Sequence, residues 1–277
     1  MTTLYRGMDR TTLDAAYSNS GAVPGSARLM VDFRTRSANV YRDVTCRRQL
    51  AYGPLPRQRY DWFAAGSADA PTFVFIHGGY WQSCTKEDFA FIVTGPMQRG
   101  FNVVLAEYTL APQATMTQIV GEIGALLDHL LGDRDGLGIA GHPLCLSGHS
   151  AGGHLTAMHR SHPVVSHAMP ISALVDLEPI SLGALNDKLQ LTAREVDVLS
   201  PLRHIDPGAP MTILVGDAEL PELVRHSRQY AADCQARGET ARYLPVPGCN
   251  HFSILEDLAA PAGVQMTALA QAMLERR

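Results

Sequence analysis

A serine between glycines stands at the junction of an expected strand and an expected helix. Residues 148–153 read Gly-His-Ser-Ala-Gly-Gly, directly after the apolar run 143–147 and directly before the helix-like stretch 154–158. On a sharp strand-turn-helix connection of this kind, the serine hydroxyl projects from the end of the sheet. Ser150 is therefore the candidate nucleophile, and a Gly-Ser-Gly turn without chemistry is the alternative interpretation.

A serine hydroxyl is a poor nucleophile near neutral pH, so it needs a base and a third group that orients the base. His251 lies in a turn-rich segment after the last expected strand, from which a loop can carry its imidazole back to the serine. Asp217 and Glu219 both follow the strand expected at 211–215. The residues alone do not choose between these carboxylates. The order serine, acid, histidine is typical of the α/β-hydrolase fold.

Other histidines compete for the role of base or metal ligand. His149 and His154 flank the serine; we expect His149 to pack beside it and His154 to belong to the following helix. His159, His162 and His167 form a loose group without the His-Glu-x-x-His spacing or nearby paired cysteines of a zinc site. The sequence therefore favours His251 as the base and predicts no metal site.

A second glycine-containing loop follows the apolar run at 72–76. Residues 77–81 read His-Gly-Gly-Tyr-Trp, and glycines let backbone amides approach a developing oxyanion closely. We expect the oxyanion donors at Gly78, Gly79 and Tyr80, with the amide of Ala151 as their partner. A simple Gly-Gly turn is the alternative.

Composition restricts the class of protein. The 277 residues are 46% hydrophobic and 18% charged, with a formal net charge of −4, which is ordinary for a globular protein and argues against a sequence-blind nucleic-acid binder. No apolar run has the length of a secretory signal or a membrane span. Five scattered cysteines without a Cys-x-x-Cys pair indicate reduced thiols. We expect a soluble cytoplasmic protein without nucleic-acid or membrane partners.

Short apolar runs alternate with helical patterns along the chain. This alternation predicts a mostly parallel sheet covered by helices on both faces, in one α/β domain over residues 1–277. We expect a lid-like insertion at about 173–209, where the rhythm breaks, over the carboxyl ends of the strands; a surface excursion without function is the alternative. The expected strands are 72–76, 102–106, 143–147, 168–172, 211–215 and 241–246, and the expected helices 86–99, 115–131, 154–158, 221–237 and 261–277.

Together these segments resemble the kynurenine formamidase (arylformamidase) branch of the α/β-hydrolases, close to the hormone-sensitive-lipase type of esterase. In that family the acid stands two positions before a Pro-Glu pair, so the resemblance implies Glu219. The chain departs from the family pattern at Glu219 and Glu107, where aspartate is usual, and at Ala173, where glycine is common. The resemblance covers roughly residues 50–258 and is carried by segments 77–81, 107–112, 148–154, 176–179, 221–223 and 251–253.

The resemblance implies acyl transfer to Ser150 and hydrolysis of the acyl-enzyme by water, without a metal or organic cofactor. His251 would accept the serine proton and pass it to the leaving group. The substrate would be a small carboxylic ester or an aryl formamide or amide, and the sequence does not separate these. The expected pocket walls, each of which could instead be packed core, are Tyr80, Trp81, Leu174, Val175 and Phe252.

Two other classes of protein predict different residues. A non-catalytic ligand-binding module on the same fold would be favoured by the loss of Ser150, the acid or His251, and all three are present. A metal-dependent amidohydrolase would need clustered histidine and aspartate ligands. The sequence leaves the oligomeric state open, with a homodimer among the options.

Overall fold

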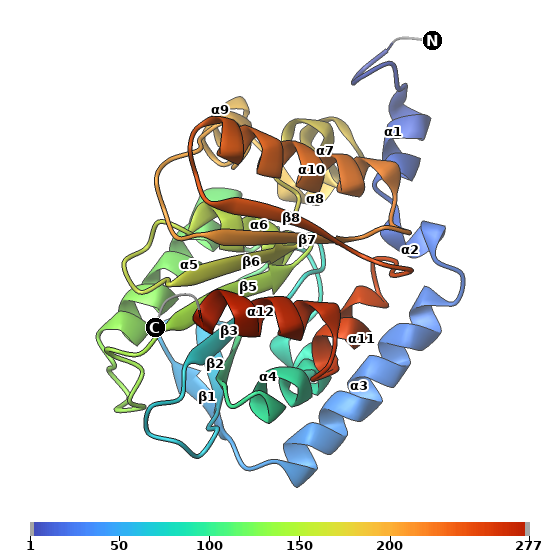
Figure 1. Cartoon of the computed structure of the whole chain (residues 1–277). Coiled ribbons are helices and arrows are strands. Elements are labelled where there is room, and N and C mark those ends of the chain that lie inside the picture. Colours follow the sequence, from blue (N-terminus) through green and yellow to red (C-terminus); the bar gives the residue numbers. More distant parts are fainter. Residues whose placement is uncertain (1–2, 275–277) are drawn as a thin grey trace.

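The computed structural model describes residues 3–274, and an eight-stranded sheet runs through its centre (Figure 1). The strand order is β1-β2-β4-β3-β5-β6-β7-β8. β2 is antiparallel to both β1 and β4, and every other neighbouring pair is parallel. The strands are β1 (Arg47–Ala51), β2 (Arg59–Phe63), β3 (Thr72–Ile76), β4 (Asn102–Ala106), β5 (Leu144–His149), β6 (His167–Ile171), β7 (Met211–Gly216) and β8 (Ala241–Val246).

Strand β3 shows why the inner strands are mostly apolar. Phe73 and Phe75 belong to one buried cluster, whereas Val74 and Ile76 belong to another. Successive side chains of a strand point to opposite faces of the sheet, so a strand covered on both faces is apolar at nearly every position. The two clusters are therefore the cores on the two faces of the sheet.

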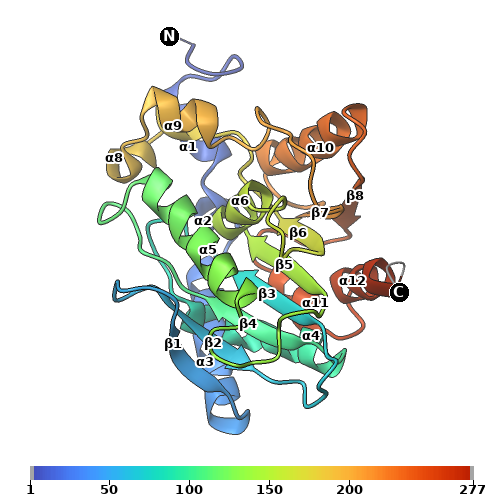
Figure 2. The ribbon, with the colours of Figure 1, turned by 90° about the vertical axis from the view of Figure 1, so that its left-hand side faces the viewer.

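Helices cover both faces (Figures 1 and 2). Residues of α5, α6 and α10 belong to the cluster that contains Ile76, and residues of α3, η1, α11 and α12 to the cluster that contains Phe75. The helices are α1 (Arg10–Ala16), α2 (Asn19–Ala22), α3 (Ser26–Asp43), the 3-10 helix η1 (Lys86–Val93), α4 (Thr94–Gln98), α5 (Met116–Leu131), α6 (Ala151–Met158), α7 (Glu178–Leu182), α8 (Asn186–Leu189), α9 (Ala193–Val198), α10 (Pro221–Ala236), α11 (Ile254–Ala259) and α12 (Val264–Leu274).

The segment between β6 and β7 carries the short helices α7, α8 and α9. Figure 2 shows it beside α1, near the N-terminal end of the described chain. The contact is specific, because a carboxylate oxygen of Asp14 in α1 accepts a hydrogen bond of 2.7 Å from the amide of Ala184. The N-terminal helices and this segment thus meet at one end of the molecule.

The mostly parallel sheet with helices on both faces confirms the predicted fold class. The predicted bounds of the strands at 72–76, 102–106 and 241–246 are those observed. The prediction of one helix over 261–277 was wrong at its start, because the helix begins at Val264 and follows the separate helix α11; residues 275–277 lie outside the described residues. The predicted helix at 86–99 begins as a 3-10 helix. Within the described residues, none of the helices combines the length and apolarity needed to cross a bilayer.

Candidate active site

The turn after β5 is strained and tightly packed. Ser150 has φ 57° and ψ −115°, a combination that non-glycine residues rarely adopt. Its amide donates to the carbonyl of Ile171 at 2.8 Å. A Cβ atom on Gly152 would lie 2.0 Å from the carbonyl oxygen of Ile76, so only glycine permits the start of α6 to pack against the end of β3. These contacts hold Ser150 at the carboxyl edge of the sheet.

The imidazole of His251 is hydrogen-bonded to a buried carboxylate. His251 Nδ1 donates to Glu219 Oε2 at 2.6 Å. The other oxygen, Glu219 Oε1, accepts from Ser172 Oγ at 2.5 Å and from the amide of Gly216 at 2.9 Å. Three donors therefore fix the carboxylate. In the neutral imidazole this arrangement holds the proton on Nδ1 and leaves Nε2 as a proton acceptor.

The second candidate acid, Asp217, is exposed and has a different partner. Asp217 Oδ1 accepts a hydrogen bond of 2.7 Å from the amide of Gly248. The two loops also meet through their backbones, because the amide of Ala218 donates to the carbonyl of Cys249 at 3.0 Å. Asp217 thus holds the loop that carries His251, whereas Glu219 contacts the imidazole itself.

His149 links the serine to the histidine. Its ring centroid lies 4.4 Å from that of His251, and it directly precedes Ser150. The turn after β5 and the loop after β8 therefore meet at one place. Burial, and secondarily the neighbouring His251, lower the pKa of His149 well below its ordinary value, so this ring is neutral. The geometry brings Ser150, His251 and Glu219 to one edge of the sheet.

His154 has other partners than the carboxylate of Glu219. Its Nε2 donates to the carbonyl of Leu199 at 2.7 Å, and its ring packs edge-on against Trp81 at 5.1 Å. Burial is the main cause that lowers its pKa to about 4. His154 lies in α6, the helix in which the sequence placed it, and is part of the packed core.

The loop after β3 presents free amides beside the serine. A Cβ atom on Gly78 would lie 3.1 Å from Ser150 Cβ, so the loop touches the nucleophile candidate. Gly79 has φ 105°, and its carbonyl accepts hydrogen bonds from the amides of Gln82 and Ser83. Tyr80 also has a positive φ, of 51°. Within residues 3–274, no acceptor faces the amides of the four predicted oxyanion donors, Gly78, Gly79, Tyr80 and Ala151.

Tyr80 also borders a pocket between the N-terminal helices and the segment that follows β6. Its hydroxyl accepts a hydrogen bond of 2.8 Å from Asn19 Nδ2 and donates to the carbonyl of Tyr17. The pocket has a volume of about 530 Å³ and lies between α1–α2 and α7–α8, with Lys188 and Asp187 on its α8 side. The N-terminal helices thus complete a wall that the sequence did not predict.

The other expected wall residues lie deeper. Trp81, Leu174 and Val175 are fully buried in the core on the α5–α6 face. Phe252 is buried on the opposite face and packs edge-on against His251, with ring centroids 5.9 Å apart. None of these four lines the 530 Å³ pocket.

Sequence reasoning missed two kinds of contact. Ser172, which supports the acid, was assigned only to a strand; its positive φ of 51° and its place at the end of β6 set it apart in the structure. Tyr17 and Asn19, which hold Tyr80, lie in a segment without a chemical motif. No signal in the sequence singles out these two.

The looser group of histidines has ordinary partners. His159 Nε2 contacts the carbonyl of Val120 at 2.8 Å, and His162 Nε2 contacts Asp128 Oδ1 at 3.1 Å. In the part of the chain that the structure describes, no three His, Cys, Asp or Glu side chains are grouped so that they could hold a metal ion.

Comparison with known proteins gives a consistent result. The family model BD-FAE matches residues 63–164. The kynurenine formamidase of Danio rerio is 29% identical over 226 residues, which cover 76% of this chain and 75% of that protein. A putative thioesterase of Silicibacter sp. TM1040 superimposes with a TM-score of 0.84 at 26% identity and covers 93% of this chain and 98% of its own.

A Pyrobaculum calidifontis esterase has the same fold, with a TM-score of 0.72 at 16% identity over 97% of this chain and 99% of its own. The chain has the α/β-hydrolase fold, it is similar to kynurenine formamidases and esterases, and it is a hydrolase of the serine-hydrolase type.

Proposed function

We propose that this enzyme hydrolyses aryl formamides and small carboxylic esters through an acyl-enzyme on Ser150. The observation that carries the proposal is the 2.6 Å contact between His251 Nδ1 and Glu219 Oε2 beside the strained turn of the serine. His251 Nε2 takes the proton of the serine hydroxyl as the hydroxyl attacks the carbonyl carbon. Glu219 stabilises the imidazolium that forms, and His251 then gives this proton to the departing amine or alcohol.

Water completes the cycle. His251 removes a proton from the water that attacks the acyl-enzyme, and the carboxylic acid leaves as Ser150 recovers its proton. Both steps place negative charge on the former carbonyl oxygen. The amides of Gly78, Gly79, Tyr80 and Ala151 are the donors that stabilise it; their freedom from other acceptors and the contact of Gly78 with Ser150 support this assignment.

Burial favours a small acyl group. Ser150 is only 2% exposed and His251 only 6%, so a formyl or acetyl group fits beside them better than a long chain does. The 530 Å³ pocket bordered by Tyr80 has the size to take an aromatic leaving group. In this proposal the segment 173–209 acts as a lid-like insertion within a single α/β domain, and its helices α7 and α8 form one wall of the pocket. The similarity to a kynurenine formamidase makes N-formylkynurenine the first substrate to test.

The test compares turnover of N-formylkynurenine, an aryl acetamide and p-nitrophenyl acetate by the wild type, Ser150→Ala and Ser67→Ala. Ser67 is an exposed loop serine and serves as the matched control. We expect Ser150→Ala to lose turnover of every substrate that the wild type hydrolyses, and a fluorophosphonate probe to label the wild type and Ser67→Ala alone. The proposal would be overturned if Ser150→Ala turned over a substrate as fast as the wild type does, or if the wild type turned over none of the three substrates.

A further inference from the structure

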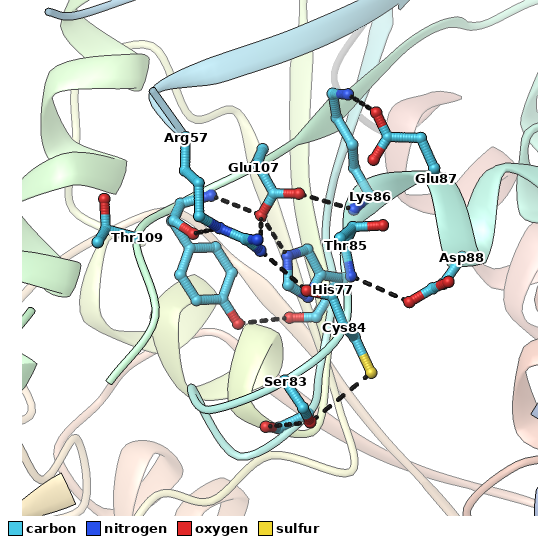
Figure 3. Close-up of polar contacts among 12 residues, drawn as sticks. Arg57, His77, Ser83, Cys84, Thr85, Lys86, Glu87, Asp88, Glu107 and Thr109 are labelled. Carbon is cyan, nitrogen blue, oxygen red and sulfur yellow. Dashed lines mark hydrogen bonds and ion pairs between the residues drawn. The ribbon is translucent and has the colours of Figure 1, made fainter. Parts of the chain in front are cut away.

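His77, the first residue of the oxyanion loop, has an acceptor at each ring nitrogen, and Figure 3 shows one of them, the carboxylate of Glu107. Its Nδ1 lies 2.8 Å from the carbonyl oxygen of Gly78, and its Nε2 lies 2.9 Å from Glu107 Oε1. A neutral imidazole carries only one proton and can satisfy only one of these acceptors. The arrangement is complete when both nitrogens are protonated, that is, when His77 is an imidazolium.

Glu107 is held as a carboxylate. Besides His77, its Oε1 accepts from Arg57 Nη2 at 2.6 Å and from the amide of Tyr108 at 3.0 Å, and its Oε2 accepts from the amide of Lys86 at 3.1 Å. Burial by itself raises the pKa of this carboxyl, but His77, Arg57 and the Tyr108 amide together hold it below its usual value. An ionised carboxylate accepts only, so the shared proton belongs to His77.

The surroundings of His77 suit a cation. Its fully buried ring is stacked on that of Tyr108, with centroids 4.5 Å apart and planes 14° apart, and lies nearly parallel to that of Phe89 at 6.3 Å. Aromatic faces attract cations. Arg57 also donates to the carbonyls of Tyr108 and Cys84, so the guanidinium joins both flanking segments to the carboxylate. A buried charge needs partners of this kind.

We propose that Glu107 is a positioning residue of this enzyme, which keeps His77 as an imidazolium so that His77 clamps the carbonyl of Gly78. A trans peptide is planar, with its C=O and N–H groups pointing in opposite directions. When His77 Nδ1 holds the Gly78 carbonyl on the buried side, the amide of Gly79 therefore points to the other side, where the oxyanion forms. Tyr108 acts on the preceding peptide in the same way, because its hydroxyl donates to the carbonyl of His77 at 3.1 Å. This inference rests on the proposed function of the loop.

The negative charge of Glu107, and not only the shape of its side chain, is needed to keep the Gly78 carbonyl in place. In Glu107→Gln, the carboxamide oxygen would take the place of Oε1, since three donors converge there and only one faces Oε2. His77 would keep its Nε2 proton for that oxygen, and a neutral ring would then turn the lone pair of Nδ1 toward the carbonyl of Gly78. Two acceptors would face each other, and the Gly78 carbonyl would turn away.

The matched control is Glu122, a second buried carboxylate that receives a backbone amide from the same segment, that of Thr109 at 2.8 Å. We expect Glu107→Gln to lower kcat about 10² to 10³-fold, the usual effect of losing one oxyanion donor, with KM changed less than about threefold. Glu122→Gln should keep kcat within about threefold of the wild type. Affinity for phenylboronic acid, whose tetrahedral adduct with the serine uses the same donors, should fall about as much as kcat in Glu107→Gln alone.

A second measurement does not depend on a variant. The ¹⁵N chemical shifts of His77 in the wild type at pH 7.5 should show both ring nitrogens protonated. Glu107→Asp, which keeps the charge, should recover at least part of the kcat lost in Glu107→Gln. A neutral His77 in the wild type, or equal kcat in Glu107→Gln and Glu122→Gln, would overturn the inference. The proposed function would still stand in either case if Ser150→Ala is inactive, so the two failures are distinguishable.

Discussion

The choice of Glu219 over Asp217 as the orienting acid gives the sharpest prediction. Glu219 has a fully buried side chain and receives hydrogen bonds from His251, Ser172 and Gly216. In Glu219→Gln, the carboxamide oxygen would satisfy Ser172 and Gly216, so its NH₂ group would face His251 Nδ1. The imidazole would then accept at Nδ1 and carry its proton on Nε2, where it can no longer accept the serine proton.

The expected loss follows from this tautomer. An amide in place of the triad carboxylate costs about 10⁴ in kcat in the serine protease that serves as the type case, which corresponds to about 5 kcal/mol of transition-state stabilisation. We expect a loss of 10³ to 10⁴ in kcat for Glu219→Gln. In Asp217→Asn, the amide oxygen still accepts from Gly248, and we expect less than a threefold change.

The assay is steady-state hydrolysis of the best substrate at saturating concentration, with circular dichroism and thermal melting to show that both variants fold. Labelling by a fluorophosphonate should slow in parallel with kcat in Glu219→Gln, because the probe reacts with the same activated hydroxyl. Equal and small losses in the two variants, or a larger loss in Asp217→Asn, would refute the reasoning.

Two further predictions concern stability. Gly152→Ala should destabilise the fold strongly, because its Cβ would lie 2.0 Å from the carbonyl oxygen of Ile76. The exposed Gly121 in α5 has open space around it. Gly121→Ala should therefore raise the free energy of unfolding, measured in urea titrations, by about 0.5 to 1 kcal/mol. His159 has its pKa lowered to about 4, chiefly by burial, so between pH 6.5 and about 4 the unfolded chain binds a proton that the folded chain does not, and stability falls as the pH falls. His159→Gln should reduce the slope of unfolding free energy against pH in this window by up to about 1.4 kcal/mol per pH unit. An unchanged slope, or the same reduction in the exposed control His204→Gln, would contradict this account.

The inner sheet was predictable because burial on both faces leaves a simple pattern. Strands β3 and β4 are apolar at every position after the first, and their predicted bounds are those observed. Strand β1 was not predictable on this basis, because it reads Arg-Arg-Gln-Leu-Ala and is mostly exposed at the edge of the sheet. Strand β2 contains Asp61, which is fully buried and balanced by an ion pair with Lys86 at 3.2 Å. The residues around Asp61 contain no pattern that predicts its ion-pair partner Lys86, which lies 25 positions later.

In the candidate site, the residue types could likewise be predicted from the sequence, whereas their partners could not. Ser150, His251 and the two carboxylates were found because their types and order along the chain carry information. The contacts that distinguish Glu219 from Asp217 come from Ser172, Gly216 and Gly248, and those contacts depend on how the ends of β6, β7 and β8 converge. Only the folded chain reveals them.

Two buried pairs of histidine and glutamate stand close to the proposed oxyanion site, and their difference lies in the second nitrogen of each imidazole. In His251 one nitrogen faces Glu219 and, among the described residues, the other has no hydrogen-bond partner, so in the proposed mechanism this second nitrogen accepts the serine proton. In His77 one nitrogen faces Glu107 and the other faces a carbonyl oxygen, so the proposed imidazolium would have both of its protons held in place. The same pair of residue types can therefore move a proton in one position and fix a backbone in the other, and the partner of the second nitrogen decides which.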